Sequence, residues 1–164
     1  MTLRDAREAD LPAIVEIYNA TIPGRMVTAD TEPVSVESRV AWFHAHNPRT
    51  RPLWVYEEDA QICAWFSFNS FYGRPAYNPT AEVSLYVAER HRRRGLGRKL
   101  LLEAIARSPA HDMRTLLGFI WAHNEPSLSL FAAHGFERWG YLPRVAILDG
   151  VERDLIILGR RVAP

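Results

Sequence analysis

The segment EVSLYVAERHRRRGLGRKLLL, residues 82–102, changes from a strand pattern to a helix pattern within a few residues. Its first six residues alternate strictly in polarity, which is typical of a strand with two unlike faces. From Leu96 onward the apolar residues recur at helical spacing, so Gly95 and Gly97 fall where the helix begins. The predicted strand presents Val83, Leu85 and Val87 on one face and Glu82, Ser84 and Tyr86 on the other.

A glycine-rich helix start is a favourable place for a phosphate group. The first N–H groups of a helix have no partner within it, the helix dipole favours anions, and glycine allows close approach to the backbone. Two well-known phosphate loops do not match: there is no Gly-Lys-Ser/Thr string, and Leu100 stands where the dinucleotide motif needs a third glycine. We therefore expect a pyrophosphate at residues 93–98, with an exposed basic helix start as the alternative.

Composition narrows the possible classes of protein. The 164 residues suit a single domain over residues 1–164, and 48% hydrophobic with 24% charged residues is ordinary for a globular chain. A net charge of +1 argues against a nucleic-acid binder with a generally basic surface. No segment has the length of a membrane span or the pattern of a signal peptide, which favours a cytoplasmic protein. Cys63 is the single cysteine and is predicted to be buried.

The remaining patterns predict a mixed α/β chain with a partly antiparallel sheet. Asp10 is expected to cap the first helix, and Asn124 is expected to cap the last helix before Gly135 ends it. Asp149-Gly150 is a hairpin turn signal. The predicted strands are 3–6, 53–58, 61–71, 82–87, 115–122, 144–148 and 153–160, and the predicted helices are 11–18, 36–46, 96–108 and 125–134.

Two motifs carry a resemblance to a known family. Residues 92–97, RRRGLG, match (Gln/Arg)-x-x-Gly-x-(Gly/Ala) between a strand and a helix, and this resembles the acetyl-CoA pyrophosphate loop of the GNAT N-acetyltransferases. NEPSLSLFAAHGF, residues 124–136, resembles the second signature of that family. More narrowly, IYN at 17–19, TEP at 31–33 and RPAYNPTAEVSLYV at 74–87 look like the phosphinothricin acetyltransferase branch, which includes methionine sulfone and methionine sulfoximine acetylating relatives.

The resemblance covers the chain from about Arg4 to the last strand and implies a fold and a set of site residues. The implied fold is a mostly antiparallel sheet with one splayed parallel pair, flanked by helices. The implied cosubstrate is acetyl-CoA, with no metal, and the branch is commonly dimeric. The resemblance assigns the pyrophosphate to Arg92, Arg93, Arg94, Gly95, Leu96, Gly97 and Arg98, the pantetheine arm to the backbone of Leu85, Tyr86 and Val87, a further cofactor contact to Asn124, and the amino-acid substrate to Arg74, Pro75, Ala76 and Tyr77.

Glu82 is the candidate general base. A free α-amine has a pKa of about 7.7 to 8.0, so roughly a tenth is neutral at pH 7 and a base has to supply little more than the remaining order of magnitude. Glu82 precedes the cofactor-binding part of its strand, where an acidic residue of the resembling family deprotonates the amine. The alternative is a surface carboxylate. Phe131 stands where the family carries a Tyr, or in this branch often a His, and Phe131 has no proton to donate to the leaving thiolate.

The leading hypothesis is an acetyl-CoA-dependent N-acetyltransferase acting on a small amino-acid-like amine, with phosphinothricin, methionine sulfoximine and methionine sulfone as candidates. The alternatives are an acetyltransferase of protein N-termini or lysines and a non-catalytic acyl-CoA sensor. A nucleic-acid module using residues 90–94 ranks last because the net charge is near neutral. His44 and His46 are two positions apart on a predicted helix, so they face different directions and are expected to be solvated rather than to bind a metal.

Overall fold

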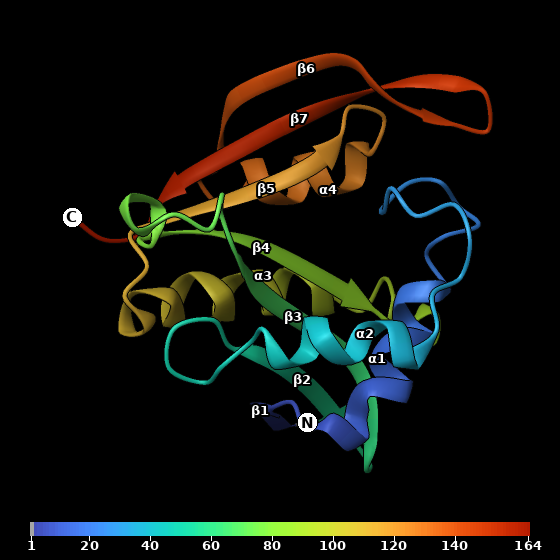
Figure 1. Ribbon diagram of the computed structural model, residues 1–164, viewed down its shortest axis with the longest axis vertical. Helices are drawn as coiled ribbons and strands as arrows, with labels where there is room; N and C mark the ends of the chain where they lie inside the picture. The colour runs from blue at the N-terminus through green and yellow to red at the C-terminus, as the bar shows by residue number, and fades with distance from the viewer. Residues whose placement is uncertain (1) are drawn as a thin grey trace.

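A computed structural model describes residues 2–164 as one seven-stranded sheet with helices on both faces (Figure 1). The strand order is β1-β2-β3-β4-β5-β7-β6, and every neighbouring pair is antiparallel except β4 and β5. The predicted fold class, a mostly antiparallel sheet with one parallel pair, is therefore confirmed. The strands are β1 Thr2–Asp5, β2 Leu53–Glu58, β3 Gln61–Ser70, β4 Thr80–Val87, β5 Thr115–Trp121, β6 Glu137–Leu148 and β7 Val151–Arg161.

Four helices cover the sheet in two layers. α1 (Leu11–Asn19) and α2 (Val36–His44) pack against β3 and β4 on one face, where Trp65 and Val55 join their cluster. α3 (Leu96–Arg107) and α4 (Glu125–Ala132) cover the other face. Figure 1 shows α1 and α2 on the near side of β3 and β4, with α3 and α4 behind the sheet. Within residues 2–164, no helix combines the length and the apolar character needed to cross a membrane.

The alternation predicted for the central strand is confirmed. Val83 and Leu85 belong to the main core beneath α3, whereas Tyr86 belongs to the cluster beneath α1 and α2. The neighbouring strand β3 alternates in the same way, with Phe66 in the main core and Trp65 on the opposite face. Both faces of β4 are therefore fixed by burial, which holds its register.

β4 and β5 separate soon after they begin. Their parallel ladder joins Thr80–Glu82 to Thr115–Leu117 and stops there. β3 remains paired with β4 as far as Val87, and β5 remains paired with β7 as far as Trp121. The later part of β4 therefore has a free backbone edge that faces β5 across an opening (Figure 1).

The structure corrects the start of the last hairpin. β6 begins at Glu137 rather than at Arg144. Gly140 and Pro143 interrupt the alternating pattern in the sequence, and the register shifts beside both residues, between Arg138 and Gly140 and between Leu142 and Ala146. Bulges of this kind keep a strand paired although its sequence lacks a regular period. The predicted turn at Asp149-Gly150 is confirmed by positive φ at both residues.

Asp10 stands at the N-cap position of α1, as predicted, but its side chain does not cap the helix. Asp10 ends a short 3₁₀ helix, Glu8–Asp10, and its carboxylate makes no bond to the first N–H groups of α1. It accepts hydrogen bonds from the Arg7 N–H at 2.7 Å and from the Arg4 guanidinium at 2.7 Å instead. The Arg4 ion pair lowers the pKa of the Asp10 carboxyl, although burial acts in the opposite direction.

Candidate functional site

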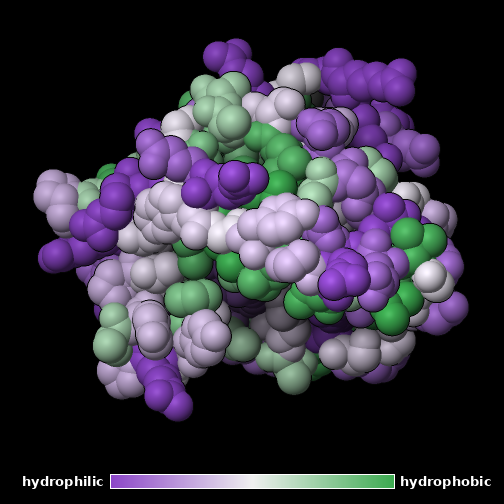
Figure 2. Space-filling model, turned by 90° about the horizontal axis from the view of Figure 1, so that it is seen from above, coloured by the Kyte–Doolittle hydropathy of each residue, from purple (hydrophilic) through white to green (hydrophobic). Residues whose placement is uncertain are grey.

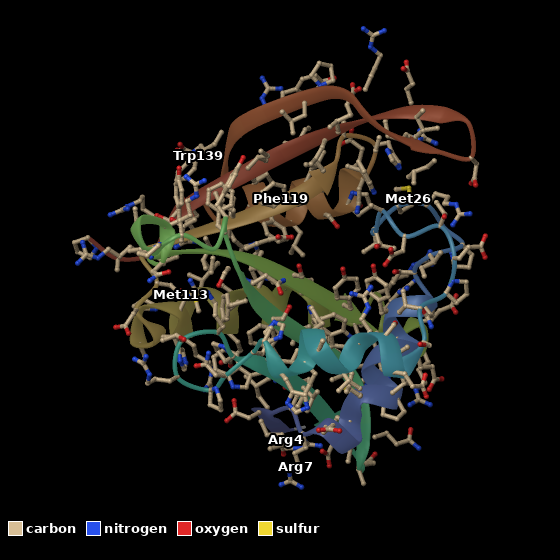
Figure 3. All side chains as sticks on the ribbon, viewed as in Figure 1. Arg4, Arg7, Met26, Met113, Phe119 and Trp139 are labelled. Atoms are coloured by element: carbon tan, nitrogen blue, oxygen red, sulfur yellow. The ribbon has the colours of Figure 1, made fainter. Side chains whose placement is uncertain are left out.

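The opening between β4 and β5 forms a cleft. Ser84, Leu85 and Tyr86 line it from β4, and Gly118 to Ile120 line it from β5. Phe119 lies on β5, and Met26 lies in the α1–α2 loop near the far end of the same strand (Figure 3). The cleft therefore brings together the strand with a free edge and the start of α4.

The floor of the cleft depends on Gly118. A Cβ atom at this position would lie 2.8 Å from the ring of Phe131, so only glycine fits beside that ring. Phe131 is buried in α4, lines the cleft and packs edge-to-face on Phe136, with ring centres 4.8 Å apart. The cleft also presents the free backbone edge of β4 and the polar residues Ser84, Asn124 and Ser127. The predicted pairing of β4 with a pantetheine chain would need a free strand edge of this kind.

The predicted phosphate loop has the backbone shape that anion binding requires. Arg93 and Gly95 adopt left-handed conformations, with φ of 59° and 75°, and α3 begins at Leu96. The Lys99 N–H bonds to the Gly95 carbonyl at 3.1 Å, as the first full turn of the helix closes. The N–H groups that precede Lys99 in this turn have no helical acceptor. A hollow of about 220 Å³ beside the loop is lined by His91, Arg94, Gly95, Leu96 and Lys99.

The arginines around this loop keep positive charge near the surface. Arg92, Arg93, Arg94 and Arg98 are exposed. The Arg92 Nε donates to the Val87 carbonyl at 3.3 Å, and an Arg94 nitrogen lies 3.6 Å from the Glu58 carboxylate. The loop therefore combines backbone donors with exposed cations, a combination that favours anions.

Asn124 caps α4 as predicted. Its Oδ1 accepts from the Ser127 N–H at 3.3 Å, and its Nδ2 donates to the Met26 carbonyl at 2.7 Å. The neighbouring His123 is hydrogen-bonded to the Arg25 carbonyl at 2.8 Å. Asn124 therefore joins the α1–α2 loop to the edge of the cleft, and its direct contact with the cofactor stays a prediction.

Glu82 lies where the sheet begins to open. It is the last residue of β4 paired with β5, and on its other side it faces Asn69 of β3. Burial raises the pKa of the Glu82 carboxyl, and the nearby Ser84 hydroxyl lowers that pKa by a smaller amount. A carboxylate with a raised pKa is a stronger base at neutral pH. The position and the environment of Glu82 both suit proton abstraction.

A second hollow lies on the other side of β4, beneath α1 and α2, and we call it the α1–α2 cavity. Its volume is about 160 Å³. Ser84 and Tyr86 line both this cavity and the cleft, so the two spaces are neighbours along β4. The sequence did not indicate this cavity because its walls come from distant segments. Its lining includes Tyr18, Arg39, Trp42, Trp65, Ser67 and Asn69.

The predicted substrate residues lie apart from both spaces. Arg74, Pro75, Ala76 and Tyr77 are exposed on the loop between β3 and β4, and none of them lines the cleft or the cavity. This loop reaches the cleft through its aromatic rings. The Tyr77 ring centre lies 5.5 Å from that of Phe71, which lies 6.4 Å from that of Phe119.

A buried arginine that the sequence did not single out holds this loop. The Arg51 guanidinium donates to the Asn78 carbonyl at 2.7 Å and to the Ser70 hydroxyl at 3.0 Å. Arg51 is 8% exposed, and burial lowers its pKa. Because its partners are neutral oxygens among residues 2–164, the charge serves to fix the loop rather than to form an ion pair.

The two histidines of the second helix behave differently. His44 is exposed, and its Nε2 lies 3.1 Å from the Glu8 carboxylate. His46 is half-buried beside Trp42, its Nε2 has no contact with solvent, and its Nδ1 bonds to the Trp42 carbonyl at 2.8 Å, so the expected solvation is wrong for this residue. Burial lowers the pKa of His46. Within residues 2–164, no three His, Cys, Asp or Glu side chains are grouped closely enough to hold a metal ion.

Comparison with known proteins places these features in context. The family model described as the Acetyltransferase (GNAT) family matches residues 11–136. The chain is 54% identical over 164 residues to "Putative phosphinothricin acetyltransferase YwnH" of Bacillus subtilis (strain 168). This match covers 99% of this chain and 100% of that protein. It is 30% identical to the L-methionine sulfoximine/L-methionine sulfone acetyltransferase of Pseudomonas paraeruginosa, over 99% of this chain and 95% of that protein.

Solved structures show the same likeness. A phosphinothricin acetyltransferase of the GNAT superfamily from Sinorhizobium meliloti, solved in complex with AcCoA, superimposes with a TM-score of 0.91. That match has 28% sequence identity and covers 99% of this chain and 88% of the other chain.

Proposed function

The chain belongs to the acetyltransferase (GNAT) family, as its two signatures predicted, and we propose that its acceptor is a small amino-acid-like amine. The reaction is acetyl transfer from acetyl-CoA to an amine. The names of its relatives suggest phosphinothricin, methionine sulfoximine and methionine sulfone as acceptors. One observation carries the proposal best: the β4–β5 ladder ends at Glu82, beside an open strand edge.

The cleft and the loop at residues 92–98 together suit the binding of acetyl-CoA. The backbone of Arg92 to Arg98 would hold the pyrophosphate, and the free edge of Leu85 to Val87 would pair with the pantetheine arm. One N–H group of that edge would donate to the carbonyl oxygen as it gains negative charge. Backbone donors suit this task because the strand already fixes their direction before the reaction.

Glu82 would remove the proton of the acceptor amine, directly or through water. Burial favours this role because it raises the pKa of the carboxyl toward that of the amine. The departing sulfur needs little help, because a thiol with a pKa of about 8.5 leaves readily as a thiolate. Tyr86 also lines the cleft, but burial raises its pKa, so its hydroxyl is a weaker acid than an ordinary phenol. Water would therefore protonate the sulfur after departure.

A thiol-release assay tests the proposal. Acetyl-CoA is mixed with free amino acids, with N-terminal peptides or with a capped lysine, and kcat/KM is compared. We expect release with free amino acids to exceed release with peptides by at least about tenfold, because the cavity beside Glu82 is small. Tight acetyl-CoA binding without release to any amine would support an acyl-CoA sensor instead.

We also propose that the enzyme forms a homodimer through the β6–β7 hairpin. Apolar side chains interrupt the polar surface on this face (Figure 2). Trp139, Val145 and Ile147 are each about half exposed or more, and β6 is an edge strand. Light scattering should give a dimer mass, and Ile147→Arg should shift it to a monomer. An unchanged dimer in this variant would place the interface elsewhere.

We propose further that residues 1–164 form one domain and that the enzyme works in the cytoplasm without membrane or nucleic-acid partners. The shared sheet supports the first point, because β1 and β7 belong to it together. A free buried thiol at Cys63 is consistent with a reducing compartment. The basic run at residues 90–94 is accounted for by the phosphates of acetyl-CoA.

A further inference from the structure

The α1–α2 cavity has the size and rigidity of a small-molecule pocket. Its volume of about 160 Å³ is close to that of cavities that bind benzene. The Tyr86 ring stacks on Trp65 at 4.3 Å, and Trp42 meets Trp65 edge-to-face at 5.7 Å. The Trp65 Nε1 donates to the Ile14 carbonyl at 3.1 Å. These contacts fix the walls before any ligand arrives, which favours binding.

The charges beside the cavity are paired with each other. An Arg39 nitrogen lies 2.9 Å from the Asp30 carboxylate, and the guanidinium lies 4.8 Å from the centre of the Tyr18 ring. The Tyr18 hydroxyl donates to the same carboxylate at 2.5 Å. Among the described residues that line this space, Arg39 supplies the full charge, and Asp30 balances it. The cavity is therefore suited to an uncharged group with apolar sides.

Ser67 gives the cavity one unused hydrogen bond. Its side chain is fully buried, and its Oγ has no hydrogen-bond partner among residues 2–164. Buried hydroxyl groups are nearly always paired, because an unpaired one destabilises the fold. Ser67 lines the cavity, so a ligand oxygen pressed against this wall would give the buried hydroxyl the partner that it lacks.

The sheet places Ser67 and Glu82 at a useful separation. Ser67 faces Ser84 across the β3–β4 ladder, and Asn69 faces Glu82, so these four residues share one face. Diagonal neighbours in such a ladder lie about 7–8 Å apart. An amino acid whose amine lies at Glu82 can therefore reach Ser67 with the end of a short side chain.

We propose that the α1–α2 cavity binds the side chain of the acetyl acceptor and that Ser67 donates a hydrogen bond to an oxygen at the tip of that side chain. This inference rests on the proposed function and specifies its substrate class. The class is an amino acid with a short, uncharged side chain that ends in a hydrogen-bond acceptor, such as a sulfone or a carboxamide. The aromatic walls would contact the methylene groups.

Methionine sulfone and methionine form a matched substrate pair, because they differ only in the two sulfone oxygens. For Ser67→Ala, kcat/KM should fall about tenfold with the sulfone, the effect of one lost hydrogen bond, and should change less than about twofold with methionine. Ser129→Ala is the control, because Ser129 is exposed on α4 and should leave both values unchanged.

A second variant tests the cavity without relying on Ser67. Val34 lines the cavity, and its backbone N–H and carbonyl are both bonded to the Asn19 amide, at 3.0 Å and 2.9 Å. The backbone should therefore stay in place in Val34→Phe while the larger ring narrows the cavity. We expect KM for methionine sulfone to rise at least about tenfold, with KM for alanine within about twofold of wild type.

Calorimetry with methionine sulfone and the CoA-bound protein separates this inference from the proposed function. Binding to wild type that weakens in Ser67→Ala supports the cavity assignment even if no thiol is released, and in that case only the proposed function fails. Absence of sulfone binding to wild type overturns the assignment. Equal losses with sulfone and methionine in Ser67→Ala also overturn it, because they indicate a structural role for the hydroxyl.

Discussion

Glu82 and Leu117 form the last pair of the parallel ladder between β4 and β5. The proposed base therefore lies where β4 is still paired with β5, while the next residues of β4 border the cleft. A base needs a fixed position relative to the reacting carbonyl, and Glu82 shares its strand with the backbone N–H groups proposed to bind that carbonyl.

The first prediction concerns Glu82→Gln and the pH dependence of the rate. At pH 7 we expect kcat/KM to fall about tenfold to a hundredfold, because the amine is then mostly protonated and needs the base. The loss should shrink as the pH rises past about 8, where the free amine deprotonates by itself. A pH–rate profile lowered by the same factor throughout would assign Glu82 to positioning instead.

The same variant should be less active but more stable at high pH. The folded-state pKa of Glu82 is raised by burial, so its contribution to stability is complete below about pH 4.3 and is lost as the pH rises through the folded-state pKa. Glutamine carries no charge and avoids that loss. We expect Glu82→Gln to raise the midpoint of thermal unfolding at pH 8 but not at pH 3.5. An equal shift at both pH values would mean that the buried charge does not cause the change.

Gly97→Glu should abolish CoA binding while the fold remains intact. A Cβ atom at Gly97 would lie 3.7 Å from the nearest Leu130 atom, an ordinary contact, and a carboxylate in the first turn of a helix is favourable. The same carboxylate repels a pyrophosphate. We expect CoA affinity measured by calorimetry to fall about a hundredfold or more, with no loss of thermal stability. Gly97→Ala is the matched control and should retain most of the affinity.

Arg51→Gln should weaken substrate binding from a distance. The variant removes the donors to Asn78 and Ser70 and so loosens the loop that carries Arg74 and Tyr77. If that loop binds the acceptor, KM for the amino acid should rise several-fold while CoA affinity stays unchanged. An unchanged KM in a folded variant would remove the loop from the acceptor site.

Local patterns predicted the elements that surround the cofactor cleft. The period of β4, the glycines before α3 and the Asn124 cap each depend on neighbours in the sequence, and the structure confirms their placement. The start of β6 was not predictable in this way, because bulges beside Gly140 and Pro143 remove the alternation. Pairing with β7 nevertheless keeps that segment in the sheet.

The acceptor side depends on contacts that no local pattern contains. The α1–α2 cavity joins Tyr18, Arg39, Trp65 and Ser84 from four separate elements, and only the packed sheet brings them together. Arg51 gave no signal either, because an arginine beside prolines is usually exposed. The motif-based assignment of Arg74 and Tyr77 remains a prediction, since both lie outside the spaces that the structure forms.

The last prediction asks whether Phe131 limits the reaction. Phe131 packs beside Gly118 and lines the cleft, so a hydroxyl added in Phe131→Tyr would lie near the sulfur path. A general acid contributes about a hundredfold to ten-thousandfold at most, far less than a whole enzyme, so wild type should already turn over. We expect Phe131→Tyr to be at least as fast in single-turnover measurements, which exclude product release.

Phe136→Tyr is the matched control, because Phe136 contacts Phe131 but belongs to the core rather than to the cleft lining. The control should lose stability, since its hydroxyl would be buried in an apolar cluster, and should gain no rate. A rate increase in both variants would point to altered packing. A rate increase confined to Phe131→Tyr would identify proton delivery to the departing thiolate as the step that the phenylalanine leaves to water.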